Sequence, residues 1–284
     1  MTTSRKRRRS TAEVYKQTEQ RAWNTFSGRY TKLALPEFKP YGDRLIKLAQ
    51  VRRGMWVLDV ATGPGEPALT IAPRVAPNGL VLGIDFSSAM LNTARARARQ
   101  SGIHNAQFQR MDAERLKLPD MMFDRVFCRF GLMLMPDAEL ALAEMYRVLA
   151  PEGRAVVAVW SIQAKVNTLG IVRDVLVRHR AFTPPTGAPD FFRFGKTGAL
   201  ERALRTAGFR NIRSERMTIE WVFADPEDFW KAMKQGPSLK RSLAGLSISR
   251  RRVIKEEVCQ RLERFMRGGA LRIPNEAVLG VGHK

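Results

Sequence analysis

The sequence predicts an α/β domain built on a doubly wound, mostly parallel sheet, and three observations in its first half support that fold class. Residues 57–60 form a short apolar run with β-branched side chains, which is typical of a buried strand. Gly63 and Gly65 follow at once and permit a tight turn. A helix is expected directly after this turn, and similar strand–helix pairs recur as far as residue 160.

The elements of this core, residues 51–160, are predicted in alternation. They are strands at 57–60, 80–85, 106–109, 125–130 and 155–160, with helices at 66–75, 88–100 and 136–149. Ser87 is expected to cap the helix at 88–100. Turns are expected at 77–79 and at 151–153, where proline and glycine interrupt the pattern.

The segment before this core, residues 11–50, is predicted to form a helical lid. Ser10 and Glu13 make a capping-box pattern that opens a helix. Trp23, Phe26 and Tyr30 fall on one face of that helix, which either docks it on the core or covers the site. Both interpretations remain open. A second helix is expected from Pro40 to Leu48.

Residues 161–284 are predicted to complete the same domain. They comprise a mostly helical cap insertion at 161–195, a helix at 198–207, a strand at 212–223, a helix capped by Asp225, a basic helical stretch reaching Met266 and a last strand at 271–281. Insertions at the carboxyl ends of strands commonly shape a ligand pocket. The phenylalanines at 191, 192 and 194 therefore suggest an apolar or aromatic ligand.

The net charge of +22 is unevenly distributed along the chain. Residues 51–160 hold 13 basic and 11 acidic side chains, whereas residues 231–267 hold 11 basic and 3 acidic ones. Residues 1–10, with five consecutive basic residues from Arg5, are expected to be a disordered tail. Such segments attract nucleic acid or an anionic membrane surface, and a generally basic surface without a partner is the alternative.

Several features bear on compartment and chemistry. The chain has no run of about 18 apolar residues, so no transmembrane span is expected. Two cysteines, Cys128 and Cys259, fit a reducing compartment, which predicts a cytoplasmic protein, with a peripheral membrane location as the alternative. We interpret Cys128 as a small buried residue rather than a nucleophile. Metal-ligand spacing is not visible, and the oligomeric state stays open.

Two cofactors compete for the glycine turn. The spacing of Gly63, Gly65 and Ala68, with Asp85 about 20 residues on, satisfies the dinucleotide fingerprint. Asp59, within the strand before the turn, discriminates between the two because a carboxylate repels a pyrophosphate and attracts a cation. S-adenosylmethionine carries an amino group and a sulfonium and has no phosphate. The pattern therefore favours S-adenosylmethionine over a nicotinamide cofactor.

Two further carboxylates fit the adenosine of such a cofactor. Asp85 ends the second strand and can accept both ribose hydroxyls, although a helix N-cap is the alternative. Asp112 follows the third strand and can accept the adenine amino group, although a surface loop acid is the alternative.

Several stretches together resemble the class I S-adenosylmethionine-dependent methyltransferases. They are residues 57–65 (VLDVATGPG), 83–90 (GIDFSSAM), 112–114 (DAE), 123–124 (FD) and 147–153 (RVLAPEG). The nearest type resembles the ubiquinone and menaquinone C-methyltransferases and their small-molecule relatives, over roughly residues 20–160. The resemblance implies a Rossmann-like sheet of seven strands, six parallel and the last antiparallel.

The resemblance also implies a set of cofactor contacts. Asp59 and the turn from Gly63 to Gly65 would face the methionine part, Asp85 the ribose, Phe86 and Met90 the adenine faces, and Asp112 and Ala113 the adenine edge. Tyr30 resembles the tyrosine near the methionine carboxylate of the family. Ala61, Thr62 and Arg129 complete the candidate cofactor site.

The function predicted on these grounds is methyl transfer from S-adenosylmethionine to a small, apolar or aromatic acceptor. The reaction would be an in-line displacement that depends mostly on positioning, and the sequence singles out no catalytic residue. The alternatives are an RNA or protein methyltransferase that uses the basic surface, an NAD-type oxidoreductase, and a protein that binds the cofactor without turnover.

Overall fold

A mixed β-sheet forms the centre of the computed structural model, which describes residues 10–33 and 35–284. Its strand order is β3-β2-β1-β4-β5-β8-β6, and the short β7 pairs with β8. The strands are β1 (Trp56–Val60), β2 (Leu80–Asp85), β3 (Ala106–Arg110), β4 (Phe123–Arg129), β5 (Leu149–Trp160), β6 (Arg210–Phe223), β7 (Met266–Arg267) and β8 (Ala270–His283).

Strands β1 to β5 are parallel, and the last long strand, β8, runs against them. Strand β8 inserts between β5 and β6 and is antiparallel to both, so six long strands share one direction. This confirms the predicted doubly wound α/β fold with an antiparallel last strand. The strand order reverses between β1 and β4, which is where open sheets of this kind bind ligands.

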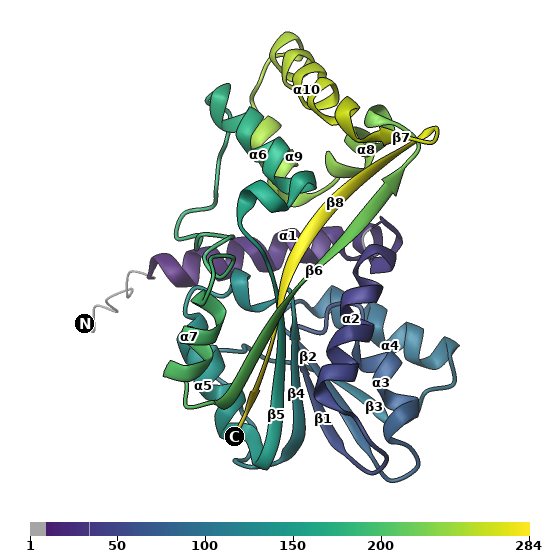
Figure 1. Ribbon diagram of the computed structural model, residues 1–284, viewed down its shortest axis with the longest axis vertical. Helices are drawn as coiled ribbons and strands as arrows, with labels where there is room; N and C mark the ends of the chain where they lie inside the picture. The colour runs from purple at the N-terminus through teal and green to yellow at the C-terminus, as the bar shows by residue number, and fades with distance from the viewer. Residues whose placement is uncertain (1–9, 34) are drawn as a thin grey trace, which may run out of the picture.

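The helices cover both faces of the sheet and extend beyond it (Figure 1). They are α1 (Thr11–Leu33), α2 (Leu35–Ala49), α3 (Ala68–Val75), α4 (Ser88–Gln100), α5 (Ala138–Val148), α6 (Asn167–Arg178), α7 (Ala199–Thr206), α8 (Pro226–Met233), α9 (Pro237–Leu243) and α10 (Ile248–Leu262), with 3₁₀ turns η1 (Leu132–Leu134), η2 (Gln163–Lys165) and η3 (Glu263–Phe265).

Two expected boundaries were wrong. Helix α2 begins at Leu35 rather than Pro40, because Pro36 occupies its first turn and Pro40 lies inside the helix. The predicted turn at 151–153 is an irregularity within β5, which pairs with β4 on both sides of it, through Leu149 and Arg154. By contrast, Ser10 and Glu13 form the expected reciprocal capping bonds at the start of α1. The rest of the predicted disordered tail, residues 1–9, lies outside the described residues.

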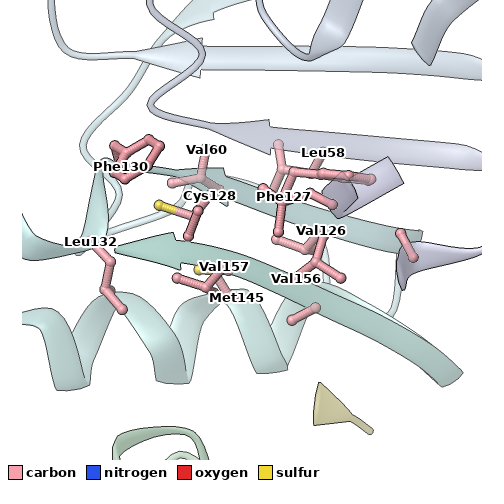
Figure 2. Close-up of a cluster of buried hydrophobic side chains, with 14 of the residues drawn as sticks. Leu58, Val60, Val126, Phe127, Cys128, Phe130, Leu132, Met145, Val156 and Val157 are labelled. Atoms are coloured by element: carbon pink, nitrogen blue, oxygen red, sulfur yellow. The ribbon is translucent and has the colours of Figure 1, made fainter. Parts of the chain in front are cut away.

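The main core lies between the sheet and its helices. Figure 2 shows Leu58, Val126 and Val157 from three neighbouring strands packed together with Met145 of α5. Cys128 is part of this cluster, and burial raises the pKa of its thiol to about 12. A thiol with that pKa is not a nucleophile at neutral pH, which agrees with its interpretation as a packing residue.

A second hydrophobic cluster lies at the far ends of β6 and β8, in a lobe formed with α6, α8, α9 and α10 (Figure 1). Within the predicted helical insertion, only residues 163–165 and 167–178 are helical, and residues 179–198 form turns and irregular segments. Phe192 and Phe194 are buried in the main core, so packing alone accounts for them. No helix in the described part of the chain has the length and apolar character needed to cross a membrane.

Candidate cofactor site

The carboxyl ends of β1, β2 and β4 bring together three buried charged side chains. Asp59 lies near the end of β1, Asp85 ends β2 and Arg129 ends β4. All three are less than a tenth exposed, and a full charge is normally kept in so dry a place only with a partner or a function.

Asp59 holds the turn that follows β1. Its Oδ2 atom accepts hydrogen bonds from the Thr62 hydroxyl at 2.6 Å and the Ala68 N–H at 3.1 Å. Its Oδ1 atom is buried and has no hydrogen-bond partner in residues 10–33 and 35–284. Burial raises the pKa of this carboxyl to about 7. The site therefore holds one carboxylate oxygen that a cationic ligand would satisfy.

The turn between β1 and α3 depends on backbone conformations that favour glycine. Gly63 has a φ of +55°, and nothing lies within 4 Å of where its side chain would begin, so a ligand can approach the backbone there. Gly65 has a φ of +96°, but a side chain there would meet Leu69 and Ala94 at 3.0 and 3.1 Å. Close packing of α3 against α4 thus accounts for Gly65 without any ligand.

Asp85 ties the glycine turn to the start of α4. It accepts hydrogen bonds from the Gly63 N–H at 2.9 Å and the Ser87 N–H at 2.8 Å, one on each carboxylate oxygen. Burial raises its pKa to about 6. The N-cap alternative is settled, because the Ser87 hydroxyl accepts the Met90 N–H. A carboxylate offers about four acceptor positions, so Asp85 keeps capacity for two further donors.

Arg129 and Tyr30 face the same edge from the other side. Arg129 donates from Nη2 to the Glu66 carbonyl at 3.1 Å, while its Nε–H has no hydrogen-bond partner among the described residues. Its guanidinium carbon lies 5.4 Å from the centre of the Phe38 ring. Burial raises the pKa of the Tyr30 phenol, so that hydroxyl is a donor at neutral pH.

Helix α1 lies across this edge, between the sheet and the lobe (Figure 1). Gln20 donates to the Phe86 carbonyl at 2.6 Å, and Asn24 accepts from the Ser87 hydroxyl and the Ala89 N–H. Its aromatic residues contact one another, with Trp23 5.6 Å and Phe26 6.1 Å from the Tyr30 ring. The predicted aromatic face is confirmed, and its role as a lid stays a prediction.

Asp112 and Ala113 lie at the end of β3, next to the other candidate contacts. Asp112 accepts the Glu114 N–H on Oδ1 and pairs through Oδ2 with Lys16 of α1 at 2.7 Å. Its side chain is 47% exposed, which distinguishes it from the buried Asp59 and Asp85. Met90 is buried in the first turn of α4. An adenine at Asp112 would share that carboxylate with Lys16.

Sequence reasoning missed an aromatic cluster beside Arg129. It joins α2, the strand ends and β6, with Phe38 4.9 Å from Phe130 and 5.3 Å from Trp221, and Phe130 4.4 Å from Trp160. The indole N–H of Trp221 is buried with no hydrogen-bond partner in the described part of the chain. These rings come from distant segments, so no local pattern announces them. The aromatic residues Phe130 and Trp160, at the ends of two predicted strands, were the available signal.

A glycine turn held between two buried carboxylates, at the reversal point of a doubly wound sheet, defines a cofactor-binding α/β protein. Comparison with known proteins narrows that class. A family profile described as "Methyltransferase domain" matches residues 57–153. Demethylmenaquinone methyltransferase of Staphylococcus aureus is 30% identical over 216 residues, which cover 70% of this chain and 87% of that protein. The chain therefore belongs to the class I S-adenosylmethionine-dependent methyltransferases, whose cofactor is S-adenosylmethionine.

Other relatives match over a shorter stretch. Demethylmenaquinone methyltransferase of Listeria welshimeri is 39% identical over 109 residues, or 38% of this chain. That alignment covers 46% of the Listeria protein, so the chain spans about half the length of the relatives that match in this way.

Solved structures agree on the fold. Phosphoethanolamine N-methyltransferase 2 of Haemonchus contortus, crystallised with S-adenosylmethionine, superposes with a TM-score of 0.61 at 19% identity, covering 98% of this chain and 61% of that one. The [4+2]-cyclase SpnF superposes with a TM-score of 0.52 at 22% identity, covering 86% and 79%. Because proteins named for different reactions share it, the fold alone does not name the acceptor.

Proposed function

We propose that the protein transfers the methyl group of S-adenosylmethionine to a small acceptor with an apolar or aromatic body. The observation that carries the proposal is the pair of unsatisfied buried atoms at the cofactor edge, Asp59 Oδ1 and Arg129 Nε. Asp59 Oδ1 can accept a hydrogen bond from a cationic group, Arg129 Nε can donate one to an anionic group, and both atoms are shielded from water. They therefore match the amino and carboxylate groups of an amino acid. The methionine part of S-adenosylmethionine is such a group.

Each candidate residue has a role in this proposal. Asp59 faces the cationic end of the methionine part, and Arg129 with Tyr30 faces its carboxylate. Asp85 uses its remaining acceptor positions for the ribose hydroxyls, and Asp112 meets the adenine edge. Because nothing lies within 4 Å of where a Gly63 side chain would begin, the ligand can approach the Gly63 backbone closely, with Ala61 and Thr62 beside it. Phe86, Met90 and Ala113 flank the adenine.

The chemistry supplied by the bound cofactor is an electrophilic methyl group on sulfur, which the nucleophile of the acceptor displaces in line. The protein contributes by positioning the acceptor against the methyl group and by excluding water from the site. Helix α1 covers the edge, and the buried aromatic cluster around Phe38 and Trp221 lies beside it. The unpartnered Trp221 N–H is a donor that can orient a polar group on the acceptor.

The small-molecule acceptor is favoured over RNA or protein by the character of this region. The elements next to Arg129 contribute aromatic rings, whereas the basic segment at residues 231–267 belongs to the lobe. Two matched relatives bear the name of an enzyme acting on demethylmenaquinone, which supports an aromatic acceptor. We propose separately that the basic segments contact an anionic membrane surface or nucleic acid. The remaining alternative for the function is a protein that binds the cofactor without turnover.

Titration calorimetry tests the cofactor part of this proposal. We expect saturable binding of S-adenosylmethionine and S-adenosylhomocysteine and no heat with NAD. Incubation with methyl-labelled S-adenosylmethionine and separate pools of quinones, phenols and total RNA then tests the acceptor. Label in a small apolar product supports the proposal, label in RNA replaces the acceptor class, and cofactor binding without any labelled product supports the non-catalytic alternative.

A further inference from the structure

A row of basic side chains crosses the sheet at the edge opposite the cofactor site. Arg125 of β4 is paired in register with Arg154 of β5, and Arg154 with His283 of β8. On β6, Arg213 is paired with Val281, which lies two residues before His283. Because side chains alternate between faces, all four basic groups lie on one face, the face that α2 covers. The chain ends beside this row, at the lower edge in Figure 1.

Like charges placed directly opposite each other destabilise a sheet. Burial and the neighbouring Arg154 hold the pKa of Arg125 below its ordinary value, with Asp124 opposing them. Burial, then Arg154, Arg125 and Arg213, hold the pKa of His283 below its ordinary value, against Glu152. The row thus places basic side chains next to one another at a cost in stability. Because sequences accept such a cost mainly at functional sites, we expect the row to bind a ligand.

Three members of the row, Arg154, Arg213 and His283, line a groove of about 800 Å³ between the end of α2 and the sheet. Its apolar surface comes from Leu48, Ile212, Leu279 and Val281, and its basic groups from Arg44, Lys47, Arg154 and Arg213. That volume lies in the range of small-molecule sites.

The acid in this groove is already neutralised. Glu215 is held by the guanidinium of Arg44 through two bonds of 2.5 Å. Lys47, Arg154 and Arg213 form no side-chain hydrogen bond or ion pair with any residue in the described part of the chain. Lys47, Arg154 and Arg213 therefore line a partly apolar groove without a partner among residues 10–33 and 35–284.

We propose that this groove binds a small organic phosphate, with the phosphate on Arg154 and Arg213 and the apolar part on Ile212 and Val281. Guanidinium groups match the geometry of phosphate oxygens and bind them through paired hydrogen bonds. Arg154 and Arg213 lie on strands whose register fixes their position. The site is distinct from the cofactor site, since S-adenosylmethionine has no phosphate and lies at the other end of the strands. The phosphate belongs either to a soluble metabolite or to a lipid headgroup.

Binding of phenyl phosphate, with inorganic phosphate and phenol beside it, tests the proposal by calorimetry. We expect saturable binding of phenyl phosphate, weaker binding of inorganic phosphate and none of phenol. Arg154→Gln and Arg213→Gln should each weaken phenyl phosphate about tenfold. Ile212→Ala should weaken phenyl phosphate and leave inorganic phosphate unchanged.

Arg251→Gln is the matched control, because it removes the same charge from an exposed position on α10 in the lobe. It should leave phenyl phosphate binding unchanged. Melting curves should show Arg154→Gln and Arg213→Gln folded and no less stable than wild type, because each substitution relieves like-charge repulsion. A loss of stability in both variants would mean that the row is structural and would overturn the proposal.

Vesicles of phosphatidylglycerol separate the two sources of phosphate. Vesicle binding that Arg154→Gln and Arg213→Gln abolish assigns the site to a lipid headgroup. Phenyl phosphate binding with no vesicle binding assigns it to a soluble ligand. If phenyl phosphate and vesicles both fail to bind, or if Arg251→Gln weakens phenyl phosphate binding as much as the groove variants do, the groove is an ordinary basic surface and the proposal is wrong.

Discussion

The two ends of the parallel strands hold ionisable side chains whose pKa values are shifted in opposite directions. At the carboxyl end, burial raises the pKa of Asp59 to about 7 and that of Asp85 to about 6. At the amino end, burial and neighbouring arginines lower the pKa of Arg125 and His283. In both places the folded chain disfavours the charged state of its own side chains, so both ends cost stability.

The cause differs between the two ends, and the difference indicates what each would bind. Asp59 Oδ1 lacks a hydrogen-bond partner within the described part of the chain, in an otherwise complete turn, so a single donor of positive charge satisfies it. The basic row instead repels itself across four strands, so an anion must span several side chains to offset it. A narrow polar contact suits one end of an amino acid, and a broad cationic face suits a phosphate.

The largest expected effect concerns the adenosine end of the cofactor site. Asp85→Ala should weaken S-adenosylmethionine far more than Asp112→Ala, by at least about tenfold for each ribose bond lost, since bonds to a charged acceptor are worth about 1.5–3 kcal/mol. Asp112 is 47% exposed and already shared with Lys16, so water can replace its adenine contact at small cost. Dissociation constants of both variants provide the measurement.

Asp85 also anchors the Gly63 and Ser87 N–H groups, so folding must be checked. Asp85→Asn retains the shape and one acceptor oxygen and is the control for the lost charge. A folded Asp85→Ala variant that binds the cofactor as wild type does would place the adenosine elsewhere on this edge.

The substitution Asp59→Asn should have a smaller effect, which raises the stability of the protein and lowers its affinity for the cofactor. Its folded pKa of about 7 exceeds its unfolded value, so its contribution to stability is complete below about pH 4 and is lost as pH rises to 7. Asp59→Asn removes this titration. The variant should gain stability relative to the wild-type protein between pH 4 and 7, with a limiting slope of about 1.4 kcal/mol per pH unit. Unfolding in urea across this range measures it.

The cofactor should respond in the opposite sense. Its cationic end favours ionised Asp59, so wild-type affinity for S-adenosylmethionine should rise from pH 6 to 8, whereas Asp59→Asn binds weakly at every pH. Equal pH dependence in the two proteins would show that the cationic end lies away from Asp59.

Local sequence signals predicted the fold class and much of the cofactor edge. Helix 88–100 was predicted with its observed bounds, because Ser87 caps it and Gly102 follows it. The turn after Asp59 was recognisable because glycine, proline and a carboxylate occur within nine residues. These features depend on contacts between near neighbours in the chain, which a sequence pattern reveals directly.

Features built from distant segments were not predicted. The basic row requires the register of β4, β5, β6 and β8, which pairs Arg125 with Arg154 and Arg154 with His283. The Lys16–Asp112 contact joins residues 96 positions apart. The hydrophobic cluster of the lobe, at the upper ends of β6 and β8, also joins residues that lie far apart in the chain. Strand register and helix docking are tertiary properties that composition and periodicity leave open.

The smallest expected effect is the coupling between the two ends of the sheet. Trp160 lies six residues after Arg154 along β5, a rise of roughly 20 Å, which exceeds the screening length of about 8 Å at physiological salt. Arg213→Gln should therefore leave the affinity for S-adenosylmethionine within about twofold of wild type, and its effect should add to that of Asp59→Asn. Calorimetry on wild type, both single variants and the double variant at about 0.15 M salt measures this. Additive free energies would mean that two independent sites share one sheet. A coupling above about 0.5 kcal/mol would mean that the basic groove and the cofactor edge act together. Phenyl phosphate should then change the affinity for the cofactor by the same factor as the cofactor changes the affinity for phenyl phosphate.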